Sequence, residues 1–547
     1  MKNHGFVVAR PLTAIVLATV AGAVLRFQGL GSRDFWFDES CTFRYVDHLF
    51  DWPGDSSLLV ESTNLPYYLA LRGWVRLFGD SEAAYRSLSA LAAAMTVPLL
   101  SLAAYRLAGS AAAVVCAVLT AFHPLHIHYA HEARAYALWL LLLTLSLVLL
   151  VEAARRQRWR WWVGYGTALL TCLFLHYFTV YWVPATLGVL ALALASDRRR
   201  TLRQWQLTAA AVLLAFMPYV VVAVWPAARQ GGSAWITPHW EPLLAIPRSL
   251  WAFLPAGGYP AHLRGLSILS PDTVVLGPQW LTALSRTVPA VVVIVVFAML
   301  ARRGMRGGGY RPAAIRVHIF LGAVSLAPLV LAWLYSLLVR PNYLVGRYDL
   351  VAWPGMILWQ AVGIALVERE RPGRVIGWPV AAICTVLVAC SLLPIARMTA
   401  LKPPPTFHNL RARELARLTA PGDLVIALSY DRDYLTYYLH RAGFRTRMVS
   451  FPSWLEGQVG WVDTAADLAP GRARRLQDDA NDRVELVLRV KAAGGRVFLL
   501  ADSIGGSSSD PRAPITEVLL TALRHAGLEP AVVDEGLLIL ELTGSGG

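Results

Sequence analysis

Two adjacent carboxylates, Asp38 and Glu39, stand among aromatic residues just after the first apolar run of the sequence. The local sequence is Phe35-Trp36-Phe37-Asp38-Glu39-Ser40. Carboxylates beside a membrane surface are costly to desolvate unless they have a partner or a chemical task. The plainer interpretation is a solvated acidic loop with a tryptophan at the interface. The alternative is a carboxylate general base, which takes the proton from a reacting hydroxyl group.

Arginines, histidines and further carboxylates lie in short segments between later apolar runs. Arginine binds phosphate bidentately and keeps its charge at low dielectric, so it suits an amphipathic lipid phosphate at a span end. Arg134 and Arg347 are the candidates, and an arginine that snorkels at a span end is an equally good explanation for each. The segments concerned are 123–136, 175–178, 340–343 and 346–349.

One histidine-rich run has spacing that resembles a metal site. On a helix, His128 and Glu132 would share a face. Pro124 interrupts the early part of such a helix, and metal sites demand a tighter geometry than this run imposes. We therefore expect that no metal is required, with a divalent ion bound at this run as the alternative. The run contains His123, His126, His128, His131 and Glu132.

The elements that must position these residues are hydrophobic helices. The chain has 547 residues, of which 56% are hydrophobic and 16% charged, with a mean hydropathy of +0.48. Uninterrupted apolar runs of roughly 17–25 residues recur, which is the length of a transmembrane helix and excludes a barrel. A polytopic α-helical membrane protein with about eleven spans is predicted. The spans are 11–27, 86–106, 110–124, 134–153, 161–176, 178–195, 206–225, 287–301, 317–339, 349–367 and 375–394.

The formal net charge of +15 comes mainly from arginines in alternate loops. Positive residues mark cytoplasmic loops, so the amino terminus is expected inside and no nucleic-acid partner is needed to explain the charge. The five cysteines show neither a disulfide framework nor zinc-site spacing. The cytoplasmic clusters are Arg106; Arg155, Arg156 and Arg158; 198–200; Arg302, Arg303, Arg306 and Arg311; and Arg369, Arg371 and Arg374.

Two domains are predicted from the change in composition after residue 395. Residues 1–395 form the transmembrane domain, with outward loops at 28–85 and 226–286 and an amphipathic interfacial helix at 65–78. Residues 396–547 are richer in charge and are predicted to be a soluble extracytoplasmic α/β domain. Its expected strands are 423–429 and 496–501, and its expected helices are 482–492 and 514–526.

Several short motifs within residues 1–395 resemble those of the GT-C superfamily of membrane glycosyltransferases. The resemblance lies in the order of the motifs and in their positions relative to the predicted spans. The resemblance is to bacterial relatives of the dolichyl-phosphate-mannose protein mannosyltransferases and of the lipid A aminoarabinose transferase. Relatives commonly carry His-Pro-Pro where this chain has Asn64-Leu65-Pro66. The motifs that carry the resemblance are 37–39, 65–69, 77–82 with Arg86, 131–136, 176–178 and 347–348.

The resemblance implies inverting transfer of a sugar from a polyprenyl-phosphate donor, outside the cytoplasm. Asp38 would be the catalytic carboxylate, with Glu39 beside it. Arg134 and Arg347 would bind the donor phosphate. Residues that would support the pocket are Asn64, His131, Glu132, Tyr136, His176 and Tyr348.

We therefore expect a glycosyltransferase in the cytoplasmic (inner) membrane, with membrane lipids around it and its carboxyl-terminal domain outside. The sugar stays open among mannose, arabinose and aminoarabinose types, and the acceptor among glycan, lipid and protein. One rival is a transporter or lipid flippase, although a carrier should place its charges near the bilayer midplane rather than on one side. A second rival is a non-enzymatic assembly protein that recruits partners through its α/β domain.

Overall fold

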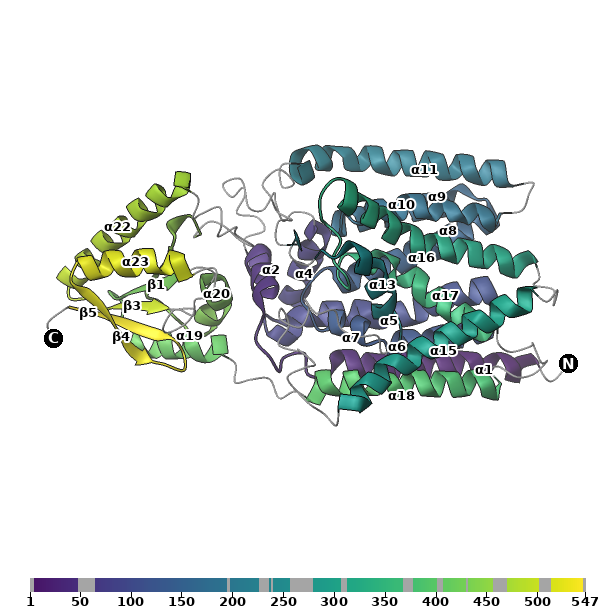
Figure 1. Ribbon diagram of the computed structural model, residues 1–547, viewed down its shortest axis with the longest axis horizontal. Helices are drawn as coiled ribbons and strands as arrows, with labels where there is room; N and C mark the ends of the chain where they lie inside the picture. Colours follow the sequence, from purple (N-terminus) through teal and green to yellow (C-terminus); the bar gives the residue numbers. More distant parts are fainter. Residues whose placement is uncertain are drawn as a thin grey trace. The chain divides into compact units, whose positions relative to one another are not determined.

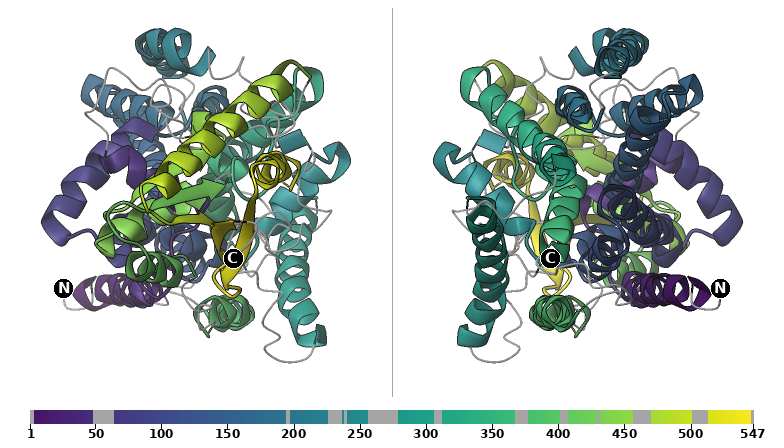
Figure 2. Two further views of the ribbon diagram at one scale, coloured as in Figure 1. Left: turned by 90° about the vertical axis from the view of Figure 1, so that its left-hand side faces the viewer. Right: turned by 90° about the vertical axis from the view of Figure 1, so that its right-hand side faces the viewer.

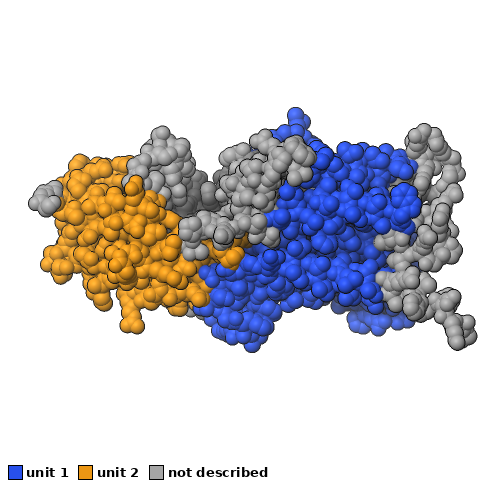
Figure 3. All heavy atoms as spheres, turned by 90° about the horizontal axis from the view of Figure 1, so that it is seen from below, with its two compact units in different colours: residues 1–31, 62–402 blue, residues 32–61, 403–547 orange. Residues whose placement is uncertain are grey.

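The chain forms two compact units in the computed structural model (Figure 3). The first unit contains residues 1–31 and 62–402, and the second contains residues 32–61 and 403–547. Parts of both predicted outward loops and of the linker after residue 400 lie outside the described residues, as do the arginines from 306 to 311 and from 369 to 374. The structure describes residues 4–47, 64–193, 197–225, 236–237, 240–255, 279–305, 312–366, 377–400, 407–428, 431–455, 470–500 and 513–544.

The first unit is helical, and its long helices run beside one another (Figures 1 and 2). Helix α5 lies at its centre, in contact with α1, α6 and α8. The helices of this unit are α1 (His4–Phe27), α4 (Leu65–Phe78), α5 (Glu82–Ala108), α6 (Ser110–Ala121), α7 (Pro124–Ala130), α8 (Tyr136–Arg156), α9 (Trp159–Leu175), α10 (Thr179–Ala185), η2 (Thr186–Ala191), α11 (Arg198–Tyr219), η3 (Val220–Val224), α13 (Pro242–Ala252), α15 (Gln279–Met305), α16 (Pro312–Leu338), η5 (Asp349–Ala352), α17 (Trp353–Ala365) and α18 (Trp378–Ala400).

Several of these helices can cross a bilayer. Among the described residues, α5, α8, α16 and the continuous helix 198–222 are long and apolar enough by length and composition, and the bent pair α6–α7 adds a fifth if it is one span. Shorter apolar helices occur at 11–27, 179–191, 287–299, 349–365 and 378–393. These helices indicate a multi-pass membrane protein, and the number of eleven spans stays a prediction.

The predicted span 110–124 is a bent pair rather than one straight helix. Helix α6 ends at Ala121, α7 begins at Pro124, and the two axes differ by 58°. Proline lacks the N–H that would continue the helix, so the break falls just before it. The carbonyl groups of Thr120 and Ala121 accept hydrogen bonds from the buried Arg26 guanidinium at 2.8 and 2.9 Å. Arg26, which ends the first apolar run, thus provides hydrogen-bond donors for the last carbonyl groups of α6.

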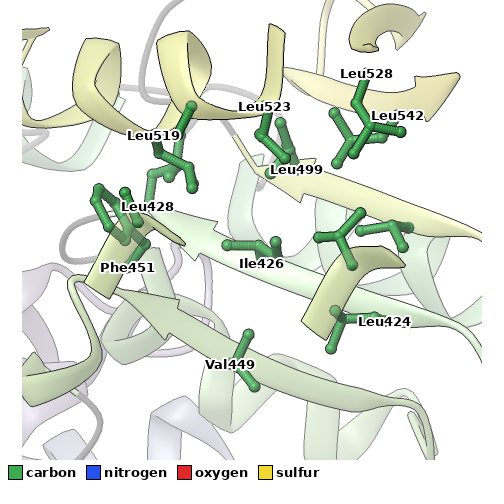
Figure 4. Packing of buried hydrophobic residues seen from close by; sticks show 14 of the residues in the cluster. Leu424, Ile426, Leu428, Val449, Phe451, Leu499, Leu519, Leu523, Leu528 and Leu542 are labelled. Carbon is green, nitrogen blue, oxygen red and sulfur yellow. The ribbon is translucent and has the colours of Figure 1, made fainter. Parts of the chain in front are cut away.

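The second unit contains a five-stranded sheet in the order β2-β1-β3-β5-β4. Strands β2, β1 and β3 are parallel, and β5 runs antiparallel to both of its neighbours, β3 and β4. Helices α22 and α23 cover one face, where Leu519 and Leu523 meet Ile426 and Leu499 (Figure 4). The elements are α19 (Phe407–Leu418), β1 (Leu424–Leu428), α20 (Asp431–Arg441), β2 (Arg447–Phe451), η6 (Ser453–Leu455), α22 (Pro470–Ala492), β3 (Val497–Leu500), α23 (Ala513–His525), β4 (Leu528–Asp534) and β5 (Ile539–Gly544).

The first predicted outward loop contains a helix that the sequence did not indicate. Helix α2 (Phe37–Asp47) belongs to the second unit and contacts α20. The buried carboxylate of Asp34, just before α2, accepts hydrogen bonds from the backbone N–H groups of His408 and Asn409 at 2.9 and 3.2 Å. These are among the first N–H groups of α19, which have no partner within their own helix. Asp34 therefore caps α19 across 374 residues of sequence.

His408 makes the stability of the second unit dependent on pH. Burial, followed by the positive charge of Arg411, lowers the pKa of His408 from 6.5 to about 4. The unfolded chain binds more protons than the folded chain between these values, so stability is complete above pH 6.5 and is lost as the pH falls toward 4. Lowering the pH from 7 to 5 should cost about 2 kcal/mol through this group. In the full chain, His408→Gln should reduce this pH dependence, measured by amide exchange of β1. An unchanged dependence would contradict the assignment.

Candidate functional site

The guanidinium of Arg347 is held inside an aromatic cluster of the first unit. Its Nε donates to the hydroxyl of Tyr136 at 2.7 Å, and the guanidinium lies over the rings of Tyr136 and Tyr348, 5.6 and 5.9 Å from their centroids. Tyr129 supports this arrangement, because its hydroxyl donates to the carbonyl of Gly346 at 2.5 Å. Arg347 is buried, with 6% of its surface exposed. A buried cation of this kind is suited to an anionic partner.

His176 joins the same cluster from the end of α9. Its ring stacks on Trp139 at 4.3 Å and lies 5.8 Å from the ring of Tyr136 and 5.2 Å from that of Tyr348. Its Nδ1 accepts a hydrogen bond from the N–H of Phe178 at 3.3 Å. Since Nδ1 is an acceptor, the neutral ring carries its proton on Nε2. The predicted site residues Tyr136, His176, Arg347 and Tyr348 are thus brought together, from the start of α8, the α9–α10 turn and the segment before η5.

Arg134 lies in the turn between α7 and α8 and is partly exposed. Its carbonyl group accepts a hydrogen bond from the hydroxyl of Ser89 at 3.2 Å, which ties the turn to α5. Both Arg134 and Arg347 are close enough to His176 to interact with it electrostatically. The two predicted phosphate-binding arginines are therefore both near His176 of the aromatic cluster.

The histidine run does not converge on one point. His126 Nδ1 lies 2.7 Å from Arg26 Nη2, His128 Nε2 lies 3.0 Å from Glu132 Oε1, and His131 Nε2 lies 3.0 Å from the carbonyl of Leu25. No group of three or more histidine, cysteine, aspartate or glutamate side chains within the described part of the chain could hold a metal ion.

His123 has different partners again. Its Nε2 is 3.4 Å from the indole Nε1 of Trp353 and 3.4 Å from the carbonyl of Phe253, and its ring meets that of Trp353 edge-on. The histidines of this run therefore pack and tie together separate parts of the helical unit, since the polar partners of their ring nitrogens differ.

Asp38 and Glu39 lie in the first turn of α2, in the second unit. Glu39 is fully buried, and its Oε2 accepts a hydrogen bond from the N–H of Trp36 at 3.3 Å. This bond satisfies an N–H group at the start of the helix, as in a capping box. Asp38 is partly exposed. Of the two carboxylates, Asp38 is therefore the better placed to meet a ligand.

Asn64 immediately precedes α4, where it is partly exposed and makes no side-chain capping bond to that helix. Pro66 near the start of α4 fits the first helical turn, whose N–H groups have no acceptor within the helix. Helix α4 forms where the amphipathic helix 65–78 was predicted.

Sequence reasoning included Asp349 in the segment 346–349 but gave it no role, and its carboxylate is buried in the first unit. It has 1% of its surface exposed and lies close enough to Tyr129 and Tyr343 to interact with them electrostatically. Tyr129 interacts in the same way with Glu132 and Arg347, so two carboxylates and an arginine lie near it. The sequence signal for Asp349 was its position directly after Arg347 and Tyr348, two of the predicted site residues.

Known proteins resemble this chain in part of its sequence and in its fold. Residues 65–225 match the family model described as dolichyl-phosphate-mannose-protein mannosyltransferase. The crystal structure of ArnT from Cupriavidus metallidurans bound to undecaprenyl phosphate is similar, with a TM-score of 0.53 and 14% identity over 96% of this chain and 97% of that chain. The apo oligosaccharyltransferase of Archaeoglobus fulgidus has a TM-score of 0.53 and 11% identity over 90% of this chain and 69% of that chain. No curated protein sequence matches this chain.

These matches confirm the predicted resemblance: the chain has the fold of the GT-C superfamily of membrane glycosyltransferases. Within it, residues 65–225 carry the pattern of the dolichyl-phosphate-mannose-protein mannosyltransferases. The matched segment contains Arg134, Tyr136 and His176, whereas Asp38 and Arg347 lie outside it.

Proposed function

We propose that the chain is an inverting glycosyltransferase that moves a sugar from a polyprenyl-phosphate donor to a hydroxyl acceptor on the outer face of the cytoplasmic membrane. One observation carries the proposal: the buried Arg347 guanidinium is held by Tyr136, and both Arg347 and Arg134 lie close enough to His176 to interact with it electrostatically. This arrangement occurs in a fold shared with ArnT, whose crystal structure contains undecaprenyl phosphate. A cationic, aromatic site at the ends of apolar helices suits a lipid phosphate.

The chemistry is a single displacement. Asp38 accepts the proton of the acceptor hydroxyl, whose oxygen attacks the anomeric carbon of the sugar. The bond between that carbon and the phosphate oxygen breaks, and polyprenyl phosphate leaves with the bonding electrons. Arg134 and Arg347 stabilise the negative charge on the departing phosphate, so the scheme requires no metal. One displacement inverts the anomeric configuration, as in inverting glycosidases.

The arginine-rich loops support an orientation with the amino terminus inside and the carboxyl-terminal domain outside. In this orientation a lipid donor would react on the outer face, and the acceptor would be a glycan, lipid or protein there.

A panel of labelled polyprenyl-phosphate sugars tests this proposal. Purified chain in nanodiscs is incubated with mannose, arabinose and aminoarabinose donors and a mixture of cell-envelope acceptors. At least one donor should be consumed, with release of free polyprenyl phosphate. Movement of intact donor lipid across liposomes without product would instead support a flippase.

Tyr136→Phe should lower kcat/KM for the donor about tenfold, because it removes a hydrogen bond to a charged group. The acceptor lost is the hydroxyl that fixes Arg347 Nε. Tyr165→Phe is the matched control, since that buried hydroxyl is hydrogen-bonded to Thr186 at 2.8 Å elsewhere in the unit. Steady-state kinetics with the consumed donor provide the measurement. Equal losses in both variants would show that the effect is not specific to Arg347.

A further inference from the structure

The segment that carries Asp38 is packed on the carboxyl-terminal sheet domain, within the second unit. Phe35 and Phe43 both contact the ring of Tyr437 in α20, with centroids 4.7 and 5.1 Å apart. All three side chains are buried. Since Phe35 precedes Asp38 and Phe43 follows it, the aromatic contacts lie on both sides of the carboxylate.

Polar contacts fix the same segment. The N–H of Phe35 donates to the hydroxyl of Tyr438 at 2.7 Å, across 403 residues of sequence. Tyr438 is buried, and each of the residues Phe35, Tyr437 and Tyr438 has 2% or less of its surface exposed. A buried N–H must find an acceptor, so the backbone just before α2 has a defined position as well as an apolar contact. The Asp34 cap on α19 adds a second polar anchor.

The first turn of α2 is internally tied. Glu39 N–H donates to the carbonyl of Trp36 at 2.9 Å, Glu39 Oε2 accepts from the N–H of Trp36, and the hydroxyl of Thr42 donates to the carbonyl of Asp38 at 2.9 Å. The backbone of Asp38 thus takes its position from α20 through a short, hydrogen-bonded helical turn.

We propose that the carboxyl-terminal domain positions the catalytic carboxylate, because Tyr437 and Tyr438 of α20 hold α2 in place. This inference rests on the proposed role of Asp38 as general base. A general base must lie within hydrogen-bond reach of its proton, and a displacement of about 1 Å can cost about 10²-fold in rate. Phe35, Tyr437 and Tyr438 are therefore positioning residues. The donor phosphate is assigned to arginines of the first unit. Weakening the contacts of Phe35 with Tyr437 and Tyr438 should therefore lower kcat and leave donor affinity unchanged.

The test uses the full chain in nanodiscs with the variants Phe35→Ala and Tyr437→Leu. Each should lower kcat about 10–100-fold, with the donor KM and the Kd for undecaprenyl phosphate changed by less than about twofold. Amides within 38–46 should exchange faster, while those of β1 stay protected. The control is Val487→Ala in α22. This substitution removes buried side-chain volume from the core between the sheet and helices α22 and α23, and it leaves α2 unchanged. It should lower the melting temperature and leave kcat at the wild-type value.

A kcat for Phe35→Ala within about twofold of wild type, or an equal loss in Val487→Ala, would overturn the inference. If Phe35→Ala does not fold, Tyr438→Phe removes a single oxygen and should lower kcat about threefold. The two proposals fail differently. A fully active Asp38→Asn chain would overturn the proposed catalytic role, whereas an inactive Asp38→Asn chain beside a fully active Phe35→Ala chain would overturn only the positioning role.

Discussion

Replacing Asp38 by asparagine should lower kcat about 10³-fold, because the acceptor hydroxyl loses the general base that we propose for it. The amide has nearly the shape of the carboxylate, so α2 and its contacts with α20 should persist. The donor phosphate is assigned to other residues, and the Kd for undecaprenyl phosphate should therefore stay near the wild-type value. The measurement is sugar transfer from the labelled donor together with lipid-phosphate binding.

The matched control for this substitution is Asp47→Asn. Asp47 is the last residue of the same helix and is exposed, and its change should leave kcat within about twofold of wild type. Full activity of Asp38→Asn would remove this carboxylate from the chemistry. The buried carboxylate of Asp349, near Tyr129, would then be the next candidate base.

Arg347→Ala should produce the second large effect, a loss of about 10²–10³-fold in kcat/KM for the donor. The substitution removes the positive charge that we propose faces the leaving phosphate, and it leaves the hydroxyl of Tyr136 without its guanidinium partner. Arg347→Lys should fall between the alanine variant and wild type, because lysine keeps the charge but cannot form the bidentate contact. Unlike Asp38→Asn, both variants should also weaken binding of undecaprenyl phosphate.

Arg155→Ala controls for the loss of any surface arginine. Arg155 is exposed, lies at the opposite end of α8 from Tyr136, and donates to the carbonyl of Arg106 at 2.8 Å. Its removal should leave kcat/KM unchanged. Wild-type kinetics and phosphate binding in Arg347→Ala would mean that this guanidinium only packs against the aromatic cluster.

Local signals indicated part of the candidate site. Long apolar runs predicted the membrane helices, because the bilayer sets their length. Tyr136, His176 and Arg347 converge because each lies at or near the end of such a run. The contacts of the histidines could not be predicted. Their partners include the carbonyl group of Leu25 and the indole ring of Trp353, and the spacing of histidines within the run does not reveal such partners.

The location of Asp38 was beyond sequence reasoning for a different reason. Helix α2 is short, and its apolar pattern does not identify a partner. The residues that hold it, Tyr437 and Tyr438, are about four hundred positions away and belong to the sheet domain. Asp38 and the two arginines thus belong to different units, although the sequence places all of them in the transmembrane domain.

The most direct test of sugar transfer by this chain is the fate of a donor labelled at its anomeric carbon. Purified chain, labelled polyprenyl-phosphate sugar and acceptor are combined, and the linkage of the product is determined by NMR. The account predicts that the label appears on the acceptor with inverted anomeric configuration, together with one equivalent of free polyprenyl phosphate. A retained configuration, or label that crosses the bilayer while still attached to the lipid, would contradict it.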